Sequence, residues 1–490
     1  MKKLKYISAG LILALSVSSC KETLEVKPKD QIAAEEALTN ILGVSSLLNT
    51  TYSSLRGTGY YGQSFKILPD IMADNIYPIP NLNSNRLITN SLNQPGAHMG
   101  LWGLYTGGIN NANLVINAIP NVAGSAAEKN KILGEAQALR ALYYWDMVKL
   151  YGYSPLFIPT IGGVQFNFGV PIVLTPTSGA ASIQYPARNT VDEVYKQIEA
   201  DLLSAESLLA VSPSGANYYM TKTVAQAILA KVYLYWGKYS QSATYADKVI
   251  AAIGSKFVTG ANYANMYYAA NNPEAIMEIN FQATQTNGNE SLQSYYAQYP
   301  GDYALRQDQA AFVNPAVAKV GYGDFSPTPE LLALYEAGDV RRNTITPGFK
   351  GGTIVDYVRK WTPANGVNYL QHIPLMRISE MYLIRAEANL RGTTAIGATP
   401  QADLDKIRLR AGLASTPVTI AAILKERRIE LAFEGDRWFD LLRLGMDIPK
   451  STALGGSLAP ISYANDFRIL APIPVADLAV NPNLRKNEGY

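Results

Sequence analysis

The sequence predicts a mostly α-helical fold in which paired helices form a scaffold and long loops form a second, ligand-binding half. Two observations predict this fold. Apolar residues recur at spacings of three and four in several long stretches. Between these stretches lie long segments rich in Gly, Asn, Pro and Tyr, with only a few short strand candidates. The chain has 490 residues, 48% of them hydrophobic, so it can supply a large core.

The first residues indicate a targeting signal. A positively charged start is followed by the apolar run 7–17, which is too short to cross a membrane, and then by Ser18, Ser19 and Cys20. This arrangement resembles the lipobox of bacterial lipoproteins, in which the cysteine is lipidated. We therefore expect a signal peptide at 1–19, lipidation of Cys20 and a polar tether at 20–30. The alternative is an ordinary secretory signal with a chance cysteine.

Composition excludes several classes of protein. Cys20 is the only cysteine, so the chain has no internal disulfide and no cysteine-rich zinc site. The two histidines, His98 and His372, lack metal-ligand spacing, and we expect no metal or other cofactor. Without residues 1–19 the chain carries 39 basic and 39 acidic side chains, which argues against a nucleic-acid binder.

The helical signals fall into two blocks, at about 120–253 and 374–445. In the first block, Thr190 and Glu193 form a capping-box pattern before a continuous apolar stripe. Two further helices are predicted to meet at Gly237–Lys238. In the second block, Glu387 and Arg391 have the spacing of an ion pair, which we expect on a solvated face. These helix pairs resemble tetratricopeptide units, although the period is loose.

The loop-rich regions at about 56–100 and 260–373 carry the residues of a candidate binding site. Sugar recognition needs aromatic faces flanked by amide, carboxylate and guanidinium groups, and loops often carry binding residues. The first loop offers Tyr77, Asn81, Asn83, Asn85 and Arg86, and the second offers Asn287, Asn289, Tyr295, Tyr296 and Tyr299. Each could instead be a turn asparagine or a packing tyrosine. Trp102 has helical spacing with its neighbours, so we expect it in the core.

Several segments together resemble the RagB/SusD family of nutrient-uptake lipoproteins: GEAQALRALYYWDMVKLYGYSPL, PARNTVDEVYKQIEADL, RISEMYLIRAEANL, ERRIELAFEGDRWFDLLRLG and the terminal LAPIPVADLAVNPNLRKNEGY. The resemblance covers residues 31–490 and implies four tetratricopeptide-like helix pairs with an irregular ligand-binding half. It also implies an outer-membrane lipoprotein facing the cell exterior. Such a protein would act without catalysis, as the hinged lid of a SusC-like TonB-dependent transporter, and would bind a glycan.

Alternatives remain open for the ligand and for the chemistry. Asparagine side chains satisfy a peptide backbone as readily as a sugar, so a peptide-binding member of the same kind of complex is the second hypothesis. Glycoside hydrolysis uses two carboxylates, and Glu430 and Glu434 make a surface hydrolase a third hypothesis. Their arginine and aromatic neighbours favour a structural ion-pair network instead. The proline-rich C-terminal segment 472–490 is expected to be an extended strap without a helix.

Overall fold

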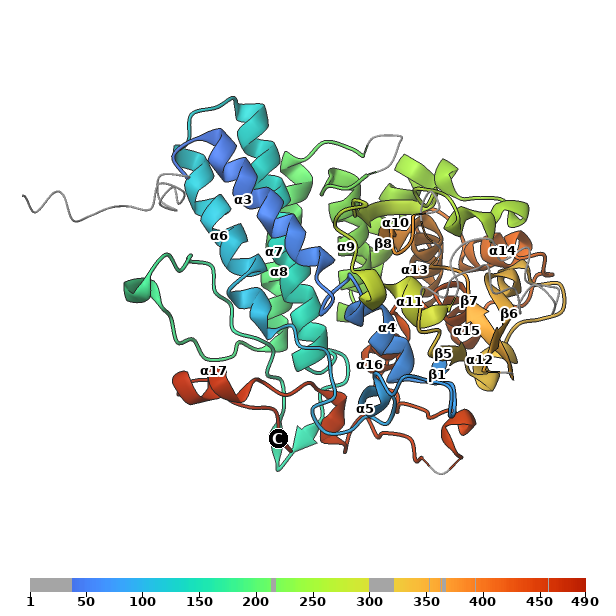
Figure 1. Cartoon of the computed structure of the whole chain (residues 1–490). Coiled ribbons are helices and arrows are strands. Elements are labelled where there is room, and N and C mark those ends of the chain that lie inside the picture. The colour runs from blue at the N-terminus through green and yellow to red at the C-terminus, as the bar shows by residue number, and fades with distance from the viewer. Residues whose placement is uncertain are drawn as a thin grey trace, which may run out of the picture.

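The computed structural model describes residues 38–490 except 213–216, 299–320, 352, 362, 364–366, 393 and 457. Two predicted residues, Cys20 and Tyr299, lie outside the described part. Helices dominate, and short strands lie among the loops (Figure 1). The prediction of a mostly α-helical fold is therefore confirmed. In the described part of the chain, no helix is both long enough and apolar enough to span a membrane.

The scaffold is a row of helices in which each packs against the next. In chain order these are α3 (Ile41–Ser53), α6 (Gly108–Ala118), α7 (Ala126–Tyr151), α8 (Val191–Leu208), α9 (Lys222–Trp236), α10 (Tyr239–Ile253), α13 (Ile378–Arg391) and α14 (Pro400–Arg410). α15 (Ile420–Glu430) also packs on α13. In Figure 1, α3 and α6–α8 form one side of the molecule, and α13–α15 lie on the other. This tetratricopeptide-like row fixes the positions of the loops between its helices.

Local sequence signals explain where several helices begin and end. Before α8, the Thr190 hydroxyl accepts from the backbone N–H of Glu193 at 3.2 Å, and the Glu193 carboxylate accepts from the N–H of Thr190 at 2.7 Å. The predicted capping box is therefore present. α9 ends at Trp236 and is capped by Gly237, whose φ of 77° is left-handed, so the predicted junction is also confirmed.

The strands form four two-stranded antiparallel sheets in the described part of the chain. The pairs are β1 (Ile76–Pro78) with β5 (Phe325–Pro327), β2 (Thr160–Ile161) with β3 (Val164–Gln165), β4 (Ala275–Ile279) with β8 (Ile373–Arg377), and β6 (Ile345–Lys350) with β7 (Thr353–Val358). Short helices accompany them: α4 (Ser64–Ile71), α5 (Ile88–Ser91), α11 (Leu292–Tyr296), α12 (Pro329–Leu332) and α16 (Arg437–Arg443). Figure 1 shows α11, β1, β5 and β7 gathered on the side of the molecule away from α3 and α6.

The C-terminal segment packs over the scaffold. The N–H of Ala471 donates to the carbonyl of Leu150 at 3.0 Å, and the Asn487 amide donates to the carbonyl of Tyr151 at 3.2 Å. The expectation that this segment contains no helix was wrong. α17 (Val475–Val480) begins directly after Pro474, since a proline at a helix start removes no required hydrogen bond.

Candidate functional site

The first predicted loop leaves β1 and makes several tight turns. Asn81, Asn85 and Leu87 have φ values of 58°, 60° and 57°, which asparagine tolerates and leucine disfavours. The backbone N–H of Ser84 donates to Asp324 Oδ1 at 3.0 Å, and the Ser84 hydroxyl donates to the other carboxylate oxygen. Asp324 therefore clamps the loop in this strained shape, and Asn81 and Asn85 remain exposed.

Arg86 joins the two predicted loops. Its guanidinium carbon lies 3.9 Å from the ring centroid of Tyr322, and its Nε lies 3.9 Å from Glu290 Oε1. The hydroxyl of Tyr322 donates to the same glutamate oxygen at 3.2 Å. The hydroxyl of Tyr295 donates to the other oxygen of Glu290. Segments more than 200 residues apart in the sequence thus meet at one charged and aromatic surface.

A second tyrosine extends this surface. The hydroxyl of Tyr369 donates to Asn289 Oδ1 at 2.8 Å, and its N–H donates to Gln293 Oε1 at 2.7 Å. Tyr369 has a φ of 65°, an uncommon conformation for a tyrosine. We use the name Arg86 cluster for the five residues Arg86, Asn289, Glu290, Tyr322 and Tyr369.

The accessible groups of the Arg86 cluster match the chemistry of an uncharged polar ligand. The side chains of Arg86 and Glu290 are 41% and 45% exposed, so solvent screens their ion pair and leaves their outer atoms accessible. Tyr322 and Tyr369 are half-buried, so each residue is partly open to solvent. Together they offer ring surface, a guanidinium, a carboxylate and an amide side by side, which is the combination of groups expected for sugar hydroxyls and ring C–H groups.

The other predicted site residues have different positions. Tyr77 lies opposite Ser326 in the β1–β5 pair, and burial raises the pKa of its half-buried hydroxyl. Tyr295 and Tyr296 are only 2% and 0% exposed, so both rings pack in the core. Ligand contact by these three rings remains a prediction, and the structure leaves little of Tyr295 or Tyr296 accessible.

Two of the predicted asparagines, and Trp102, have structural roles. Asn287 donates to the carbonyls of Arg56 and Gly62 at 3.3 and 3.1 Å, which holds the second loop against the first part of the chain. Asn83 donates to the carbonyl of Ile79 at 2.7 Å. Trp102 is buried and lies edge-on to Tyr151, as the helical spacing predicted.

Sequence reasoning missed three members of the Arg86 cluster: Glu290, Tyr322 and Tyr369. Tyr322 is flanked by Gly321 and Gly323, a turn signal beside an aromatic residue that could have drawn attention to it. No comparable pattern marks Tyr369. Its role depends on a contact with Asn289, 80 residues earlier in the chain.

Glu430 and Glu434, the acids of the hydrolase hypothesis, lie in a buried ion-pair network. Arg377 contacts Glu430 at 3.1 Å and Glu434 at 2.8 Å, and Lys360 contacts Glu434 at 2.7 Å. Burial by itself would raise the pKa of Glu434, but Arg377 and Lys360 outweigh it and hold the pKa at about 2. The pKa of Glu430 is lowered in the same way, chiefly by Arg410 and Arg377 against the effect of burial. Such carboxylates stay ionised, whereas the general acid of a glycosidase needs a raised pKa.

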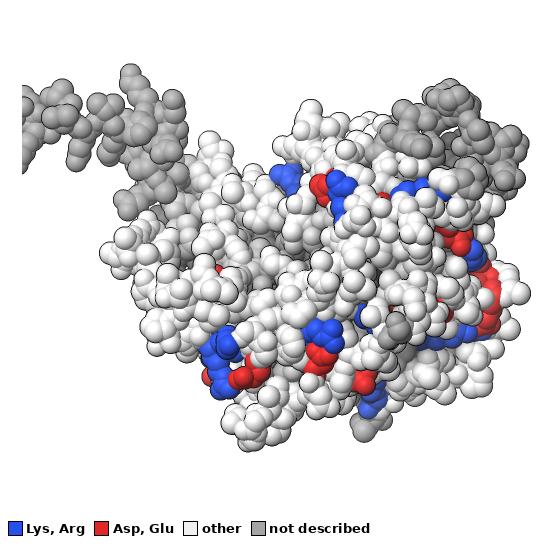
Figure 2. Space-filling model, turned by 60° about the horizontal axis from the view of Figure 1, so that its bottom comes forward, with Lys and Arg blue, Asp and Glu red and all other residues white. Residues whose placement is uncertain are grey.

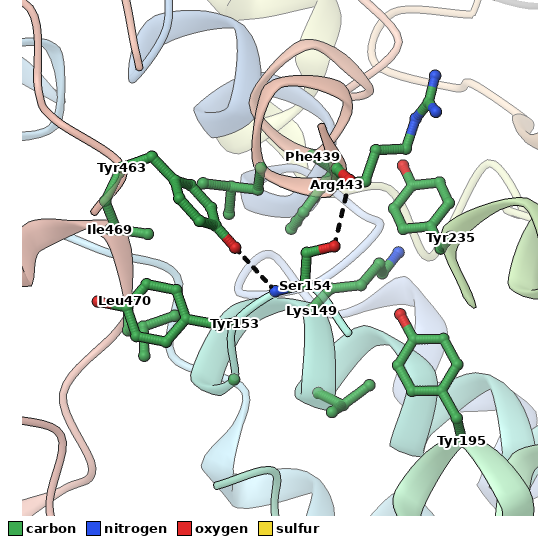
Figure 3. Close-up of a pocket in the computed structure, with 13 residues that line it drawn as sticks. Lys149, Tyr153, Ser154, Tyr195, Tyr235, Phe439, Arg443, Tyr463, Ile469 and Leu470 are labelled. Carbon is green, nitrogen blue, oxygen red and sulfur yellow. Dashed lines mark hydrogen bonds between the residues drawn. The ribbon is translucent and has the colours of Figure 1, made fainter. Parts of the chain in front are cut away.

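One pocket, shown in Figure 3, has room for little more than water. Its volume is about 20 Å³, and Tyr195, Tyr235 and Tyr463 are among the residues that line it. The N–H of Ser154 donates to the Tyr463 hydroxyl at 3.0 Å, and the Ser154 hydroxyl donates to the carbonyl of Arg443 at 3.1 Å. These bonds join the end of α7 to the C-terminal region, and the pocket is a packing defect between them.

Neither histidine has a metal-binding environment. His98 Nε2 lies 2.7 Å from the carbonyl of Arg468, and burial lowers the pKa of His98 to about 4. His372 Nδ1 accepts from the N–H of Phe281 at 3.2 Å. No group of three or more His, Cys, Asp or Glu residues in the described part of the chain could hold a metal ion.

Charged side chains on the face shown in Figure 2 are sparse, and basic and acidic groups lie next to one another. Arg485 and Glu488 form an exposed ion pair at 2.9 Å. This face has no extended basic patch of the kind that nucleic-acid binding requires. The pattern agrees with the balanced charge of the sequence.

Comparisons with known proteins agree with the fold. The sequence profile of the SusD family matches residues 341–490, and a profile described as "Starch-binding associating with outer membrane" matches residues 22–234. SusD-like protein P38 of Formosa agariphila is 27% identical over the whole length of both chains. The starch-binding protein SusD of Bacteroides thetaiotaomicron is 25% identical over 74% of each chain.

Solved structures show the same architecture. A SusD superfamily protein from Bacteroides thetaiotaomicron superposes with a TM-score of 0.76 and 25% identity, over 91% of this chain and 99% of that one. The two profiles together span the N-terminal helices, the C-terminal helices and the strap. With the tetratricopeptide-like row of helices, these matches show that the chain belongs to the SusD family.

Proposed function

We propose that this protein binds an oligosaccharide or polysaccharide at the cell surface and delivers it to a partner TonB-dependent transporter of the outer membrane. The observation that carries the proposal is the Arg86 cluster, which joins two predicted loops into one aromatic and polar surface. The family profile described as starch-binding, and the relative named as a starch-binding protein, support glycan as the ligand class.

Binding without catalysis is part of the proposal. Glu430 and Glu434 are buried, ionised and paired with arginine and lysine, which supports a structural role for both. We expect no release of reducing sugar from any glycan that the protein binds. Turnover that is lost in Glu434→Gln, with the fold intact, would establish a hydrolase instead.

We also propose that Cys20 is lipidated and that residues 20–30 tether the folded part to the membrane. The lipobox-like residues before Cys20 support this anchor. In a cell that expresses the full chain, the wild-type protein should fractionate with the outer membrane, and Cys20→Ala should release it. Equal membrane association of both forms would contradict the anchor.

Affinity gel electrophoresis tests the ligand class. Polysaccharides of different linkage are cast into native gels, and the migration of the soluble domain is compared with that in a gel without glycan. At least one polysaccharide should retard the wild-type protein. Arg86→Ala and Tyr322→Ala should each weaken that binding by about tenfold or more, since each removes a stacked or hydrogen-bonded partner worth more than about 1.4 kcal/mol.

Arg485→Ala is the matched control. Arg485 is also a half-exposed arginine that pairs with a glutamate and lies over an aromatic ring, 4.6 Å from the centroid of Phe168, but it is on the C-terminal segment. It should bind like the wild type. If no polysaccharide retards the protein and peptides co-purify with native complexes, the ligand is a peptide and the glycan proposal is wrong. Native complexes that contain no outer-membrane barrel would contradict the proposed partnership with a transporter.

A further inference from the structure

A cavity of about 320 Å³ opens at a different place from the Arg86 cluster. It lies between the C-terminal end of α3, the segment before α9 and the end of β4. Its volume falls at the lower end of the range of about 300–1,000 Å³ that is typical of small-molecule sites. None of the five residues of the Arg86 cluster lines it.

The wall of the cavity combines an apolar floor with two tyrosines. Met277 and Ile279, two residues apart on β4, form part of the floor. The hydroxyl of Tyr52 donates to Glu135 at 2.7 Å and accepts from the N–H of Met220 at 2.8 Å, so its ring is fixed. Tyr219 lies edge-on to Tyr52, at 5.5 Å between centroids, and is 51% exposed. A half-exposed aromatic ring, with Lys131 Nζ 5.9 Å from its centroid, therefore lies beside the opening.

The polar groups of the wall are mostly uncommitted amides. The side-chain amides of Asn49, Asn280 and Gln282 have no hydrogen-bond partner within the described residues. Each can donate and accept at once, as sugar hydroxyls also do. These groups are the observation that distinguishes the cavity from a packing defect such as the one in Figure 3.

The cavity is suited to a neutral ligand. Among the described residues that line it, Arg56 alone is charged, and its guanidinium donates to the neutral partners Gln285 at 2.9 Å and Ser53 at 2.8 Å. The described part of the wall therefore has no acidic group to balance a cation, and its one guanidinium can also hydrogen-bond a sugar hydroxyl. Amides, a half-exposed tyrosine and an apolar floor are the groups that recognise an uncharged saccharide.

The cavity and the Arg86 cluster are linked through one short segment. Gln285 lines the cavity, and Asn289 and Glu290, at the end of the 3₁₀ helix Gly288–Glu290, belong to the cluster. Between them, Asn287 donates to the carbonyls of Arg56 and Gly62. This segment therefore fixes the two sites relative to each other, as binding of one extended ligand at two points requires.

From these contacts we infer that the cavity is a second saccharide-binding site, which holds a short stretch of neutral sugar units. The inference rests on the proposed glycan-binding function and adds a second point of contact to it. Two sites on one polysaccharide raise the overall affinity through effective concentration, with no change at the Arg86 cluster.

Calorimetric titration with neutral oligosaccharides cut from starch, β-glucan and mannan tests the inference on the soluble domain. For the oligosaccharide that binds, the wild-type protein should show two binding sites. The double variant Tyr219→Ala/Gln282→Ala should show one. The double variant should also weaken retardation by the parent polysaccharide by about tenfold. Asn49→Trp, which places a large ring at the mouth of the cavity, should have the same effect, and melting temperatures will check that the fold is intact.

Tyr185→Ala is the matched control, since Tyr185 is 49% exposed and does not line the cavity. It should titrate like the wild type. If the cavity variants also titrate like the wild type while Arg86→Ala abolishes binding, the second site is wrong and the proposed function stands. If the wild-type protein binds no glycan at all, both proposals fall.

Discussion

Arg377 lies at the centre of one buried ion-pair network. Its side chain is fully buried, and it contacts Glu274 at 2.8 Å, Glu430 at 3.1 Å and Glu434 at 2.8 Å. Replacing it by methionine would leave these carboxylates short of a countercharge inside the protein. We expect Arg377→Met to lower the free energy of unfolding by about 3–5 kcal/mol, as measured by chemical denaturation.

Lys196→Met is the control for this prediction. Lys196 pairs with Asp192 at 2.7 Å, but the two side chains are 66% and 53% exposed, so solvent screens the pair. Its loss should cost less than about 1 kcal/mol. Equal losses for the two variants would show that the buried network contributes no more than a surface pair.

Residue-scale predictions from the sequence succeeded where the partner is local. The pair Glu387–Arg391 forms at 2.9 Å, as its spacing predicted. The expectation that this pair lies on a solvated face was wrong for Glu387. Its carboxylate is buried and also contacts Arg443 of α16 at 2.8 Å. Arg86 was predicted from the composition of its own loop, whereas its partners Glu290 and Tyr322 lie more than 200 residues away. Distant contacts of this kind leave no periodic signal in a single sequence.

At the scale of elements, Gly237 controls the turn between α9 and α10. Its φ of 77° is left-handed, which strains any residue with a side chain. A Cβ at this position would also lie 2.6 Å from Leu156 Cδ2, but that side chain is 40% exposed and can move. We therefore expect Gly237→Ala to destabilise the protein by about 1 kcal/mol through the backbone alone, as a lower melting temperature will show.

Gly59→Ala provides the comparison for this turn. A Cβ at Gly59 would meet nothing within 4 Å, and its φ is not in the left-handed region. The melting temperature should therefore stay close to that of the wild type. If both substitutions lower it equally, the left-handed turn is not the cause.

Elements were predictable where capping residues and apolar periodicity coincide. Thr190 and Gly237 marked the limits of α8 and α9 correctly. The adjacent tyrosines Tyr295 and Tyr296 were not separable from surface residues, because α11 is a five-residue helix with every residue buried. A helix that short has too few residues to show which face meets solvent.

At the scale of the whole molecule, the fold places its charge in two different ways. On the face shown in Figure 2, surface charges lie in small groups of mixed sign. Buried charges instead join the end of the helical row to the loop-rich half, as the contacts of Glu434 with Lys360 and Arg377 show. The sequence has one cysteine and therefore no internal disulfide, so helix packing and ion pairs such as these hold the two parts together.

Acid should therefore loosen the molecule as a whole. The pKa of Glu434 is about 2 in the folded protein, because Arg377 and Lys360 outweigh burial, and the ordinary value is 4.5. A lowered pKa contributes stability that is complete above about pH 4.5 and is lost as the pH falls toward 2. For this one group the loss is roughly 3 kcal/mol. Denaturant titrations at pH 4.5, 3.5 and 2.5 should show the stability of the wild-type protein falling across this range, and Glu434→Gln should have a lower but flatter profile. A wild-type profile as flat as that of the variant would contradict the role of this ion pair.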